Sequence, residues 1–187
     1  MREITRLGII LLIITAVAAA VLSYTNLITQ APIANQILQA NIAARQSVLP
    51  EASSFEEVDK NTIEGYANVL ELHKGINNGQ TVGYTVKTNP GGYGGPIEVM
   101  IGISTDAMVT GISVGNHTET PGLGAKASDD EFEVKYAGKK ASQDLTVIKA
   151  GSPKENEVIA ISGATITSRA VTSGVNTAIK LFNEKLK

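Results

Sequence analysis

The sequence contains no cysteine and no tryptophan, and the missing cysteine excludes several kinds of chemistry. Such a chain forms no disulfide, offers no thiolate nucleophile, and cannot bind zinc or an iron–sulfur cluster through sulfur. Its two histidines, His73 and His117, are far apart in the sequence and show no metal-ligand spacing. We therefore predict no metal site, and any electrons that the protein handles must be carried by an organic cofactor.

Basic residues are too few to suggest a nucleic-acid partner. The chain has 16 Lys and Arg against 18 Asp and Glu, a formal net charge of −2, whereas nucleic-acid binding normally needs a basic face. Charged residues make up 18% of the 187 positions and hydrophobic residues 43%. This length suits one domain with an additional segment, and much of the apolar excess lies at the N-terminus.

The N-terminal segment is predicted to be a membrane anchor. Between Arg6 and Arg45 there is no charged residue, and residues 7–28 would form a helix of about 33 Å, close to the thickness of the hydrocarbon core. Tyr24 falls where an interfacial aromatic residue is expected. Arg2 and Arg6 favour a cytoplasmic N-terminus, so the rest of the chain is expected outside the cytoplasm as a single-pass protein of the inner or plasma membrane.

A cleaved secretory signal is the alternative for this segment, with the Ala-Val-Ala-Ala-Ala run near the cleavage site. The apolar run is longer than the hydrophobic region of most signal peptides, and polar residues do not begin abruptly after it. These features favour a retained anchor.

The predicted fold class is α+β: one transmembrane helix, then a small mixed α/β domain with antiparallel strands and a C-terminal helix. Three parts are expected: the N-terminus and transmembrane helix over residues 1–30, an amphipathic helix and linker over 31–64, and the extracytoplasmic domain over 65–187. Pro32 is expected to end the first helix and Pro50 the second, which covers 31–48. Residues 51–64 are polar and are expected to form an irregular connection.

Alternation of apolar and polar residues predicts the strands of the domain. They are expected at residues 66–72, 81–87, 97–103, 108–114 and 145–148. The third and fourth would form a hairpin. A short helix is expected over 127–133, and helical spacing of apolar residues predicts the C-terminal helix over 168–186. Clusters of Gly and Pro predict loops at 89–96 and 117–124.

The residues before the C-terminal helix, SGATITSR at 162–169, are a candidate phosphate-binding site. A helix N-terminus presents free backbone N–H groups and a positive dipole end, and small residues allow a phosphate to approach. The hydroxyls of Thr165, Thr167 and Ser168 would add donors, and Arg169 a positive charge. Ser and Thr are also ordinary helix caps, so capping alone would explain this pattern too. It is not a Walker loop, because the glycine spacing and the lysine are missing.

Three stretches together resemble the FMN-binding G subunit of Rnf complexes, and the related C subunit of the sodium-pumping NADH:quinone oxidoreductase. The run ISGATITSRAVTSGVNTAI is similar to the flavinylation motif of that family, and GGYGGPIEVMIGI and HTETPGLGAK match further stretches. With the N-terminal anchor, the resemblance covers nearly the whole chain. The chain length favours the Rnf protein, since its quinone-reductase relative is usually longer.

The resemblance implies FMN joined by a phosphoester bond to a threonine, installed by a flavin transferase that uses FAD. The acceptor carried over by position is Thr165, with Thr167 as the rival. Many family members have Asp six residues before the acceptor, where this sequence has Ile159; Glu157 is the nearest carboxylate. The cofactor-binding residues expected from the motifs are Thr165, Ser162, Gly163, Ala164, Thr167, Glu119, Thr120, Gly122, Leu123 and Tyr93.

The two loops allow other interpretations. Leu123 is expected to cover a face of the flavin ring and Thr120 to bond to its edge, although a surface turn of the same composition need touch nothing. A local pair between Glu119 and His117 is the alternative role for those two side chains. Tyr93 is expected either to stack near the flavin or to pack against the following strand.

The implied function is electron transfer in an ion-translocating ferredoxin:NAD⁺ oxidoreductase, with the other Rnf subunits (A, B, C, D and E) as partners. No side chain is expected to act as a catalytic residue. The chain has no dinucleotide fingerprint, so NAD⁺ would bind elsewhere. A cofactor-free membrane scaffold, and an FMN domain serving another partner, are the alternatives.

Overall fold

The computed structural model describes residues 2–66 and 68–187. It separates into two compact units, Met1–Ile42 and Ala43–Lys187. Met1 and Ala67, which belong to the expected anchor and to an expected strand, lie outside the described residues.

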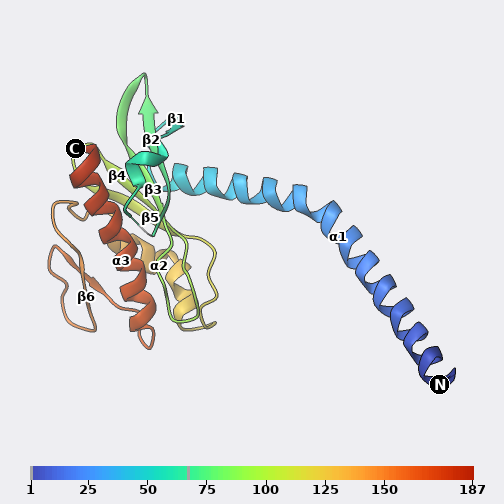
Figure 1. Ribbon diagram of the computed structural model, residues 1–187. Coiled ribbons are helices and arrows are strands. Elements are labelled where there is room, and N and C mark those ends of the chain that lie inside the picture. Colours follow the sequence, from blue (N-terminus) through green and yellow to red (C-terminus); the bar gives the residue numbers. More distant parts are fainter. Residues whose placement is uncertain (1, 67) are drawn as a thin grey trace. The chain divides into compact units, whose positions relative to one another are not determined.

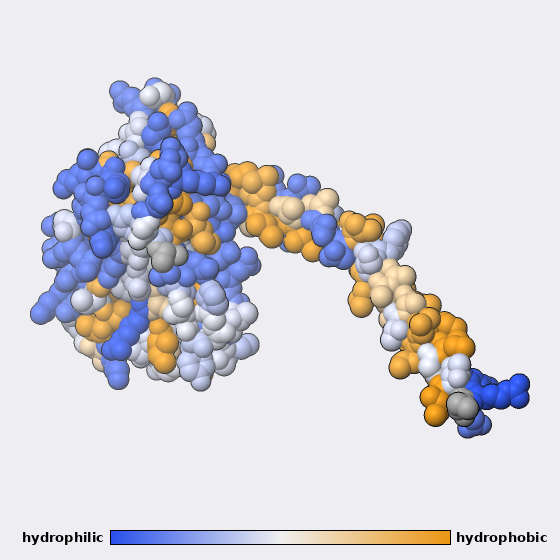
Figure 2. All heavy atoms as spheres, in the orientation of Figure 1, coloured by the Kyte–Doolittle hydropathy of each residue, from blue (hydrophilic) through white to orange (hydrophobic). Residues whose placement is uncertain are grey.

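Helix α1 (Arg2–Val48) is continuous and carries the apolar N-terminal sequence. It is long and apolar enough to cross a membrane, and Figure 2 shows hydrophobic residues along its surface. The prediction that Pro32 ends a first helix was wrong, because Pro32 lies inside α1. A proline removes one backbone hydrogen bond and strains one turn, but the turns before and after it keep their own bonds.

The second unit is built on a five-stranded antiparallel sheet in which sequence neighbours pair, in the order β1-β2-β3-β4-β5 (Figure 1). The strands are β1 (Ser54–Glu57), β2 (Val69–Asn77), β3 (Gln80–Thr88), β4 (Val99–Ser104) and β5 (Val109–Val114). The predicted hairpin is confirmed, since Val99 pairs with Val114 and Ile101 with Ile112.

The prediction of an irregular connection over residues 51–64 was wrong. Strand β1 pairs with β2, with Phe55 opposite Gly75, and the 3₁₀ helix η1 (Lys60–Ile63) follows it. β1 lies at the edge of the sheet and its side chains are mostly exposed. It therefore needs little apolar sequence, and its polar composition conceals it.

Short elements connect the sheet to the last helix. After β5 come η2 (Gly124–Ser128), α2 (Asp130–Glu133) and η3 (Val134–Tyr136), followed by two short strands that pair in parallel, β6 (Thr146–Ile148) and β7 (Glu157–Ile159). Helix α3 (Thr165–Leu181) continues into a π-helical turn, Phe182–Leu186. α3 begins three residues earlier than predicted, because Thr165 and Thr167, which resemble capping residues, are helical.

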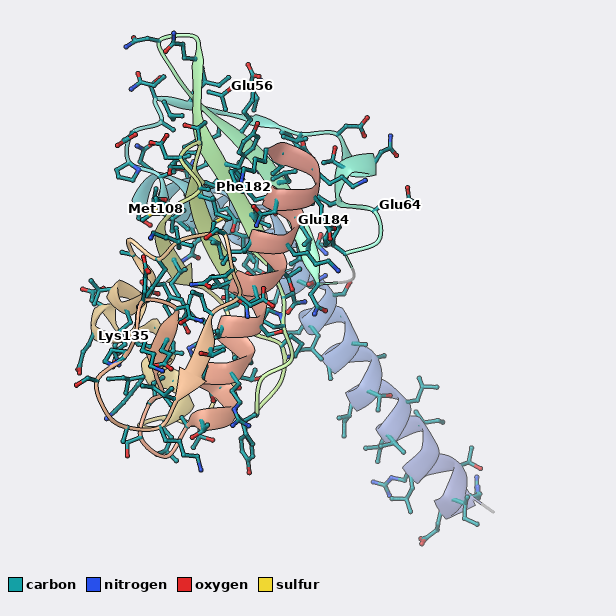
Figure 3. The ribbon with its side chains drawn as sticks, turned by 90° about the vertical axis from the view of Figure 1, so that its left-hand side faces the viewer. Glu56, Glu64, Met108, Lys135, Phe182 and Glu184 are labelled. Atoms are coloured by element: carbon teal, nitrogen blue, oxygen red, sulfur yellow. The ribbon has the colours of Figure 1, made fainter. Side chains whose placement is uncertain are left out.

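Helix α3 covers one face of the sheet and forms the main core with it (Figure 1). Ile101 and Ile103 of β4 and Val175 and Ile179 of α3 are fully or almost fully buried in this core. Phe182 lies at the C-terminal end of the helix (Figure 3). Its ring contacts Tyr84 edge to face, with ring centroids 6.2 Å apart. The apolar stripe predicted from the sequence is therefore the stripe that fixes α3 to the sheet.

The residues at the end of α1 pack against glycines of the five-stranded sheet. Val48 and Leu49 are 1% and 0% exposed, and the Val48 carbonyl accepts a hydrogen bond from the Thr110 hydroxyl. A Cβ on Gly102 would lie 2.1 Å from that carbonyl oxygen and 2.4 Å from Thr110 Oγ1. Only glycine leaves room for the chain at this position.

We expect Gly102→Ala to lower the free energy of unfolding by about 1–3 kcal/mol, because backbone must move to admit the methyl group. Gly111→Ala is the matched control: Gly111 pairs with Gly102, and its added Cβ would lie 3.6 Å from Val48 Cα, an ordinary contact. Chemical denaturation of both variants measures the difference. Equal loss in the two variants would contradict the proposed close approach.

Candidate functional site

A cavity of about 540 Å³ lies where three segments meet: the loop before β4, the loop after β5, and the N-terminal end of α3. This volume is in the range of small-molecule and cofactor sites. Its lining residues are Tyr93, Glu119, Thr120, Leu123, Gly124, Gly163, Ala164, Thr165, Ile166 and Thr167. The fold thus brings together residues of the three motif stretches GGYGGPIEVMIGI, HTETPGLGAK and ISGATITSRAVTSGVNTAI.

Most of the predicted site residues line this cavity. The two that do not are Ser162 and Gly122, which are exposed in the turns beside it. Arg169, expected to add positive charge, is exposed and outside the lining. Ile159 lies in β7 and is likewise outside the lining.

Two lining residues, Gly124 and Ile166, were not predicted. Ile166 is 55% exposed although it is a large apolar residue, and its position between Thr165 and Thr167 was the available signal. Gly124 directly follows Gly122 and Leu123, which were both predicted to bind the cofactor. Both would have followed from treating each motif as a continuous stretch of backbone.

The first turn of α3 presents backbone donors to the cavity. The ladder of helical hydrogen bonds begins with Ser168 N donating to the Ala164 carbonyl at 3.0 Å, so the N–H groups of the preceding turn have no partner within the helix. The N-cap residue is Ala164, and no side chain caps this end among the described residues. The site therefore favours an anion, since the dipole of α3 places partial positive charge there.

The three hydroxyls of this turn differ in their surroundings. Thr165 is half-buried, and its hydroxyl makes no hydrogen bond to any described residue. Thr167 is 1% exposed and its hydroxyl donates to Glu119 Oε2 at 2.7 Å. Ser168 is fully buried, and its hydroxyl donates to the Ala164 carbonyl and accepts from Ile161 N. The expectation that Ser168 faces a ligand was wrong, because its hydroxyl holds the turn before the helix.

Glu119 is buried at the junction of the three segments. One carboxylate oxygen accepts from Tyr93 N at 2.7 Å and from Gly94 N at 3.0 Å, and the other accepts from Thr167. Burial acts to raise the pKa of Glu119, but the hydrogen bonds from Thr167, Gly94 and Tyr93 and the charge of His117 outweigh it, so the pKa is lowered. Glu119 is thus an anion held inside the wall of the cavity.

The expected pairing of the His117 and Glu119 side chains takes another form. His117 Nδ1 accepts from the backbone N–H of Glu119 at 3.3 Å, and Nε2 lies 3.1 Å from Ser128 Oγ. The Glu119 carboxylate is directed instead to the loop before β4 and to α3. His117 therefore shapes the backbone of its loop.

Apolar side chains surround the mouth of the cavity. Tyr93 is 70%, Ile166 55% and Leu123 44% exposed, and they come from the three different segments. The high exposure of Tyr93 shows that it does not pack against the following strand, which was one of its two predicted positions. A planar aromatic group could contact these side chains while an attached anion reaches the helix N-terminus. Among the described residues no cluster of His, Asp and Glu could hold a metal ion.

Comparison with known proteins supports one family. A family model described as the FMN-binding domain matches residues 92–180. The G subunit of the Na⁺-translocating ferredoxin:NAD⁺ oxidoreductase complex of Acetobacterium woodii is 45% identical over 198 residues, covering 100% of this chain and 95% of the relative. The G subunit of the ion-translocating oxidoreductase complex of Methanosarcina acetivorans is 38% identical over 184 residues, covering 95% and 94%.

The fold is also found in solved structures. The crystal structure of the C subunit of the Na⁺-translocating NADH-quinone reductase from Parabacteroides distasonis is similar, with a TM-score of 0.55 and 26% sequence identity. The alignment covers 63% of this chain and 62% of that one. The predicted fold class is confirmed by this likeness and by the long apolar N-terminal helix, antiparallel sheet and C-terminal helix of the structure.

Proposed function

Because the chain belongs to the family of G subunits of ion-translocating oxidoreductase complexes, we propose that it is a membrane-anchored electron carrier with FMN esterified to Thr165. The observation that carries this proposal is the position of the Thr165 hydroxyl. Thr165 lines the cavity at an uncapped helix N-terminus, and its hydroxyl forms no hydrogen bond with any described residue. The hydroxyls of Thr167 and Ser168 are buried and engaged.

The residues of the cavity fit the parts of FMN. The N–H groups of the first turn of α3 would hold the phosphate, and Tyr93, Leu123 and Ile166 would contact the flavin ring. Thr120 would bond to the polar edge of the ring. FMN supplies the electron-transfer chemistry, and the protein supplies position and electrostatics. In this proposal no side chain is itself oxidised or reduced, and none acts as a catalytic residue.

Attachment of the cofactor requires a separate flavin transferase. The Thr165 oxygen would attack the FAD phosphorus that carries the riboflavin, forming the O–P ester bond. The pyrophosphate bond breaks, AMP leaves, and the hydroxyl proton passes to a base of the transferase. An ester bond retains the cofactor in an open cavity, where a reversibly bound flavin would be diluted into the surroundings.

The partners and location follow from the family and from α1. The chain would work with the A, B, C, D and E subunits of an Rnf complex, passing electrons between their cofactors. α1 would span the inner or plasma membrane, with Arg2 and Arg6 on the cytoplasmic side and the FMN domain outside. The likeness to the C subunit of the NADH-quinone reductase supports a second assignment, but the 26% identity is below the 45% shared with the Acetobacterium woodii relative.

Covalent flavin is tested by producing the full chain with and without a flavin transferase and separating it on a denaturing gel. The expected result is a yellow-fluorescent band only when the transferase is present. A dark band in both preparations would favour a cofactor-free scaffold. Purification with membrane partners that contain iron–sulfur clusters would separate an Rnf protein from an FMN domain with another role.

A further inference from the structure

Glu119 contacts both sides of the cofactor cavity through one carboxylate. Oε1 accepts from two consecutive amides, Tyr93 N and Gly94 N, in the loop before β4. Oε2 accepts from Thr167 Oγ1 in the first turn of α3. The residue is only 6% exposed, so water does not replace these bonds easily. Glu119 is therefore placed to hold the loop against the helix.

The backbone on both sides is closed tightly around this carboxylate. A Cβ on Gly92 would lie 2.3 Å from Glu119 Oε1, and a Cβ on Gly124 would lie 2.3 Å from Oε2. Both distances are far below a normal contact, so neither position has room for a side chain while the carboxylate is in place. The two motif loops are thus shaped around Glu119 as well as around the cavity.

The charge of Glu119 is also fixed in place. Three hydrogen-bond donors stabilise the carboxylate form, and the residue lines the same cavity as Thr165. In a buried site a charge acts more strongly on its neighbours than it does in water. Reduction adds electrons to a flavin, so a negative charge in the cavity wall opposes it.

We propose that Glu119 is a positioning residue that joins the loop before β4 to the first turn of α3 and lowers the midpoint potential of the flavin. By accepting from Thr167 it keeps that hydroxyl in a hydrogen bond and leaves the Thr165 hydroxyl as the acceptor. This inference rests on the proposed function, because it concerns a flavin held at Thr165.

Amide hydrogen exchange tests the positioning role without flavin. In the full-length protein without flavin, the amides of Tyr93 and Gly94 should exchange slowly. They should exchange at least about tenfold faster in Glu119→Ala, and stay protected in Glu119→Gln, whose amide oxygen can still accept from them. Glu133→Ala is the matched control, because Glu133 Oε1 accepts from Val114 N at 2.6 Å. It should speed exchange at Val114 only.

Two further variants keep this test decisive if Glu119→Ala does not fold. Thr167→Val removes only the bond to the helix, so Tyr93 and Gly94 should remain protected. Gly92→Ala adds a methyl group against Oε1, and should speed exchange of the same two amides. Unchanged exchange at Tyr93 and Gly94 in both Glu119→Ala and Gly92→Ala would overturn the positioning role.

Redox titration tests the effect of the charge. The midpoint potential of flavin-loaded Glu119→Gln should be more positive than that of the unaltered protein. Glu133→Gln, outside the cavity lining, should leave the potential unchanged. An unchanged potential in Glu119→Gln would overturn the electrostatic role. Failure of the unaltered chain to load flavin would instead count against the proposed function, while the exchange experiment would still test the role of Glu119.

Discussion

Replacement of Thr165 by alanine is expected to abolish covalent flavin attachment, since it removes the oxygen that forms the ester. The fold should survive, because the Thr165 hydroxyl has no hydrogen-bond partner among the described residues and alanine favours helix. The measurement is in-gel flavin fluorescence of the full chain made with a flavin transferase, together with its Tm. We expect complete loss of the yellow band with a Tm close to that of the unaltered protein.

Thr167→Val is the matched control for this prediction. Its hydroxyl is buried and donates to Glu119, so its loss should destabilise the protein by about 1–3 kcal/mol, the usual result of leaving a buried acceptor unsatisfied. The fluorescent band should nevertheless remain. The reverse pattern, with a dark Thr167→Val band and a fluorescent Thr165→Ala band, would move the acceptor by two residues.

The orientation of the chain in the membrane should give an all-or-none difference in labelling. The sequence has no cysteine, so a single introduced cysteine reports its own side of the membrane. Ser152→Cys alters an exposed position between β6 and β7, and Glu3→Cys alters an exposed position near the start of α1. In intact spheroplasts, a membrane-impermeant maleimide should label the Ser152→Cys variant and leave the Glu3→Cys variant unlabelled.

Lysis provides the control for this experiment, since both variants should then be labelled, and the unaltered protein should never be. Labelling of the Glu3→Cys variant alone in intact spheroplasts would place the domain in the cytoplasm and contradict the orientation predicted from Arg2 and Arg6. Release of a shortened, labelled Ser152→Cys chain into the medium or periplasm would favour a cleaved signal over a retained anchor.

Local sequence predicted the fold where an element carries its own apolar pattern. The alternation in the β4–β5 hairpin and the stripe on α3 both follow from burial on one face. Local sequence was misleading where contacts with other parts of the chain decide which secondary structure forms. β1 is a polar edge strand that exists because β2 offers it a partner. Pro32 was misleading for another reason: it lies inside α1, where the turns before and after it keep their own hydrogen bonds.

The site was predictable to the extent that its motifs are contiguous. Short stretches around Tyr93, Glu119 and Thr165 supplied most of the cavity lining. The direction of side chains was not predictable, because it depends on the packing of three distant segments. Thr167 and Ser168 look like Thr165 in the sequence, yet the fold buries them, and Glu119 faces the protein rather than open space.

The central claim, an ester between FMN and Thr165, is tested most directly by mass spectrometry of the tryptic peptide 155–169, which follows Lys154 and ends at Arg169. For protein taken from its native host, the peptide should be heavier by one FMN less one water, with fragmentation placing the added mass on Thr165. A peptide with only its unmodified mass would contradict the claim.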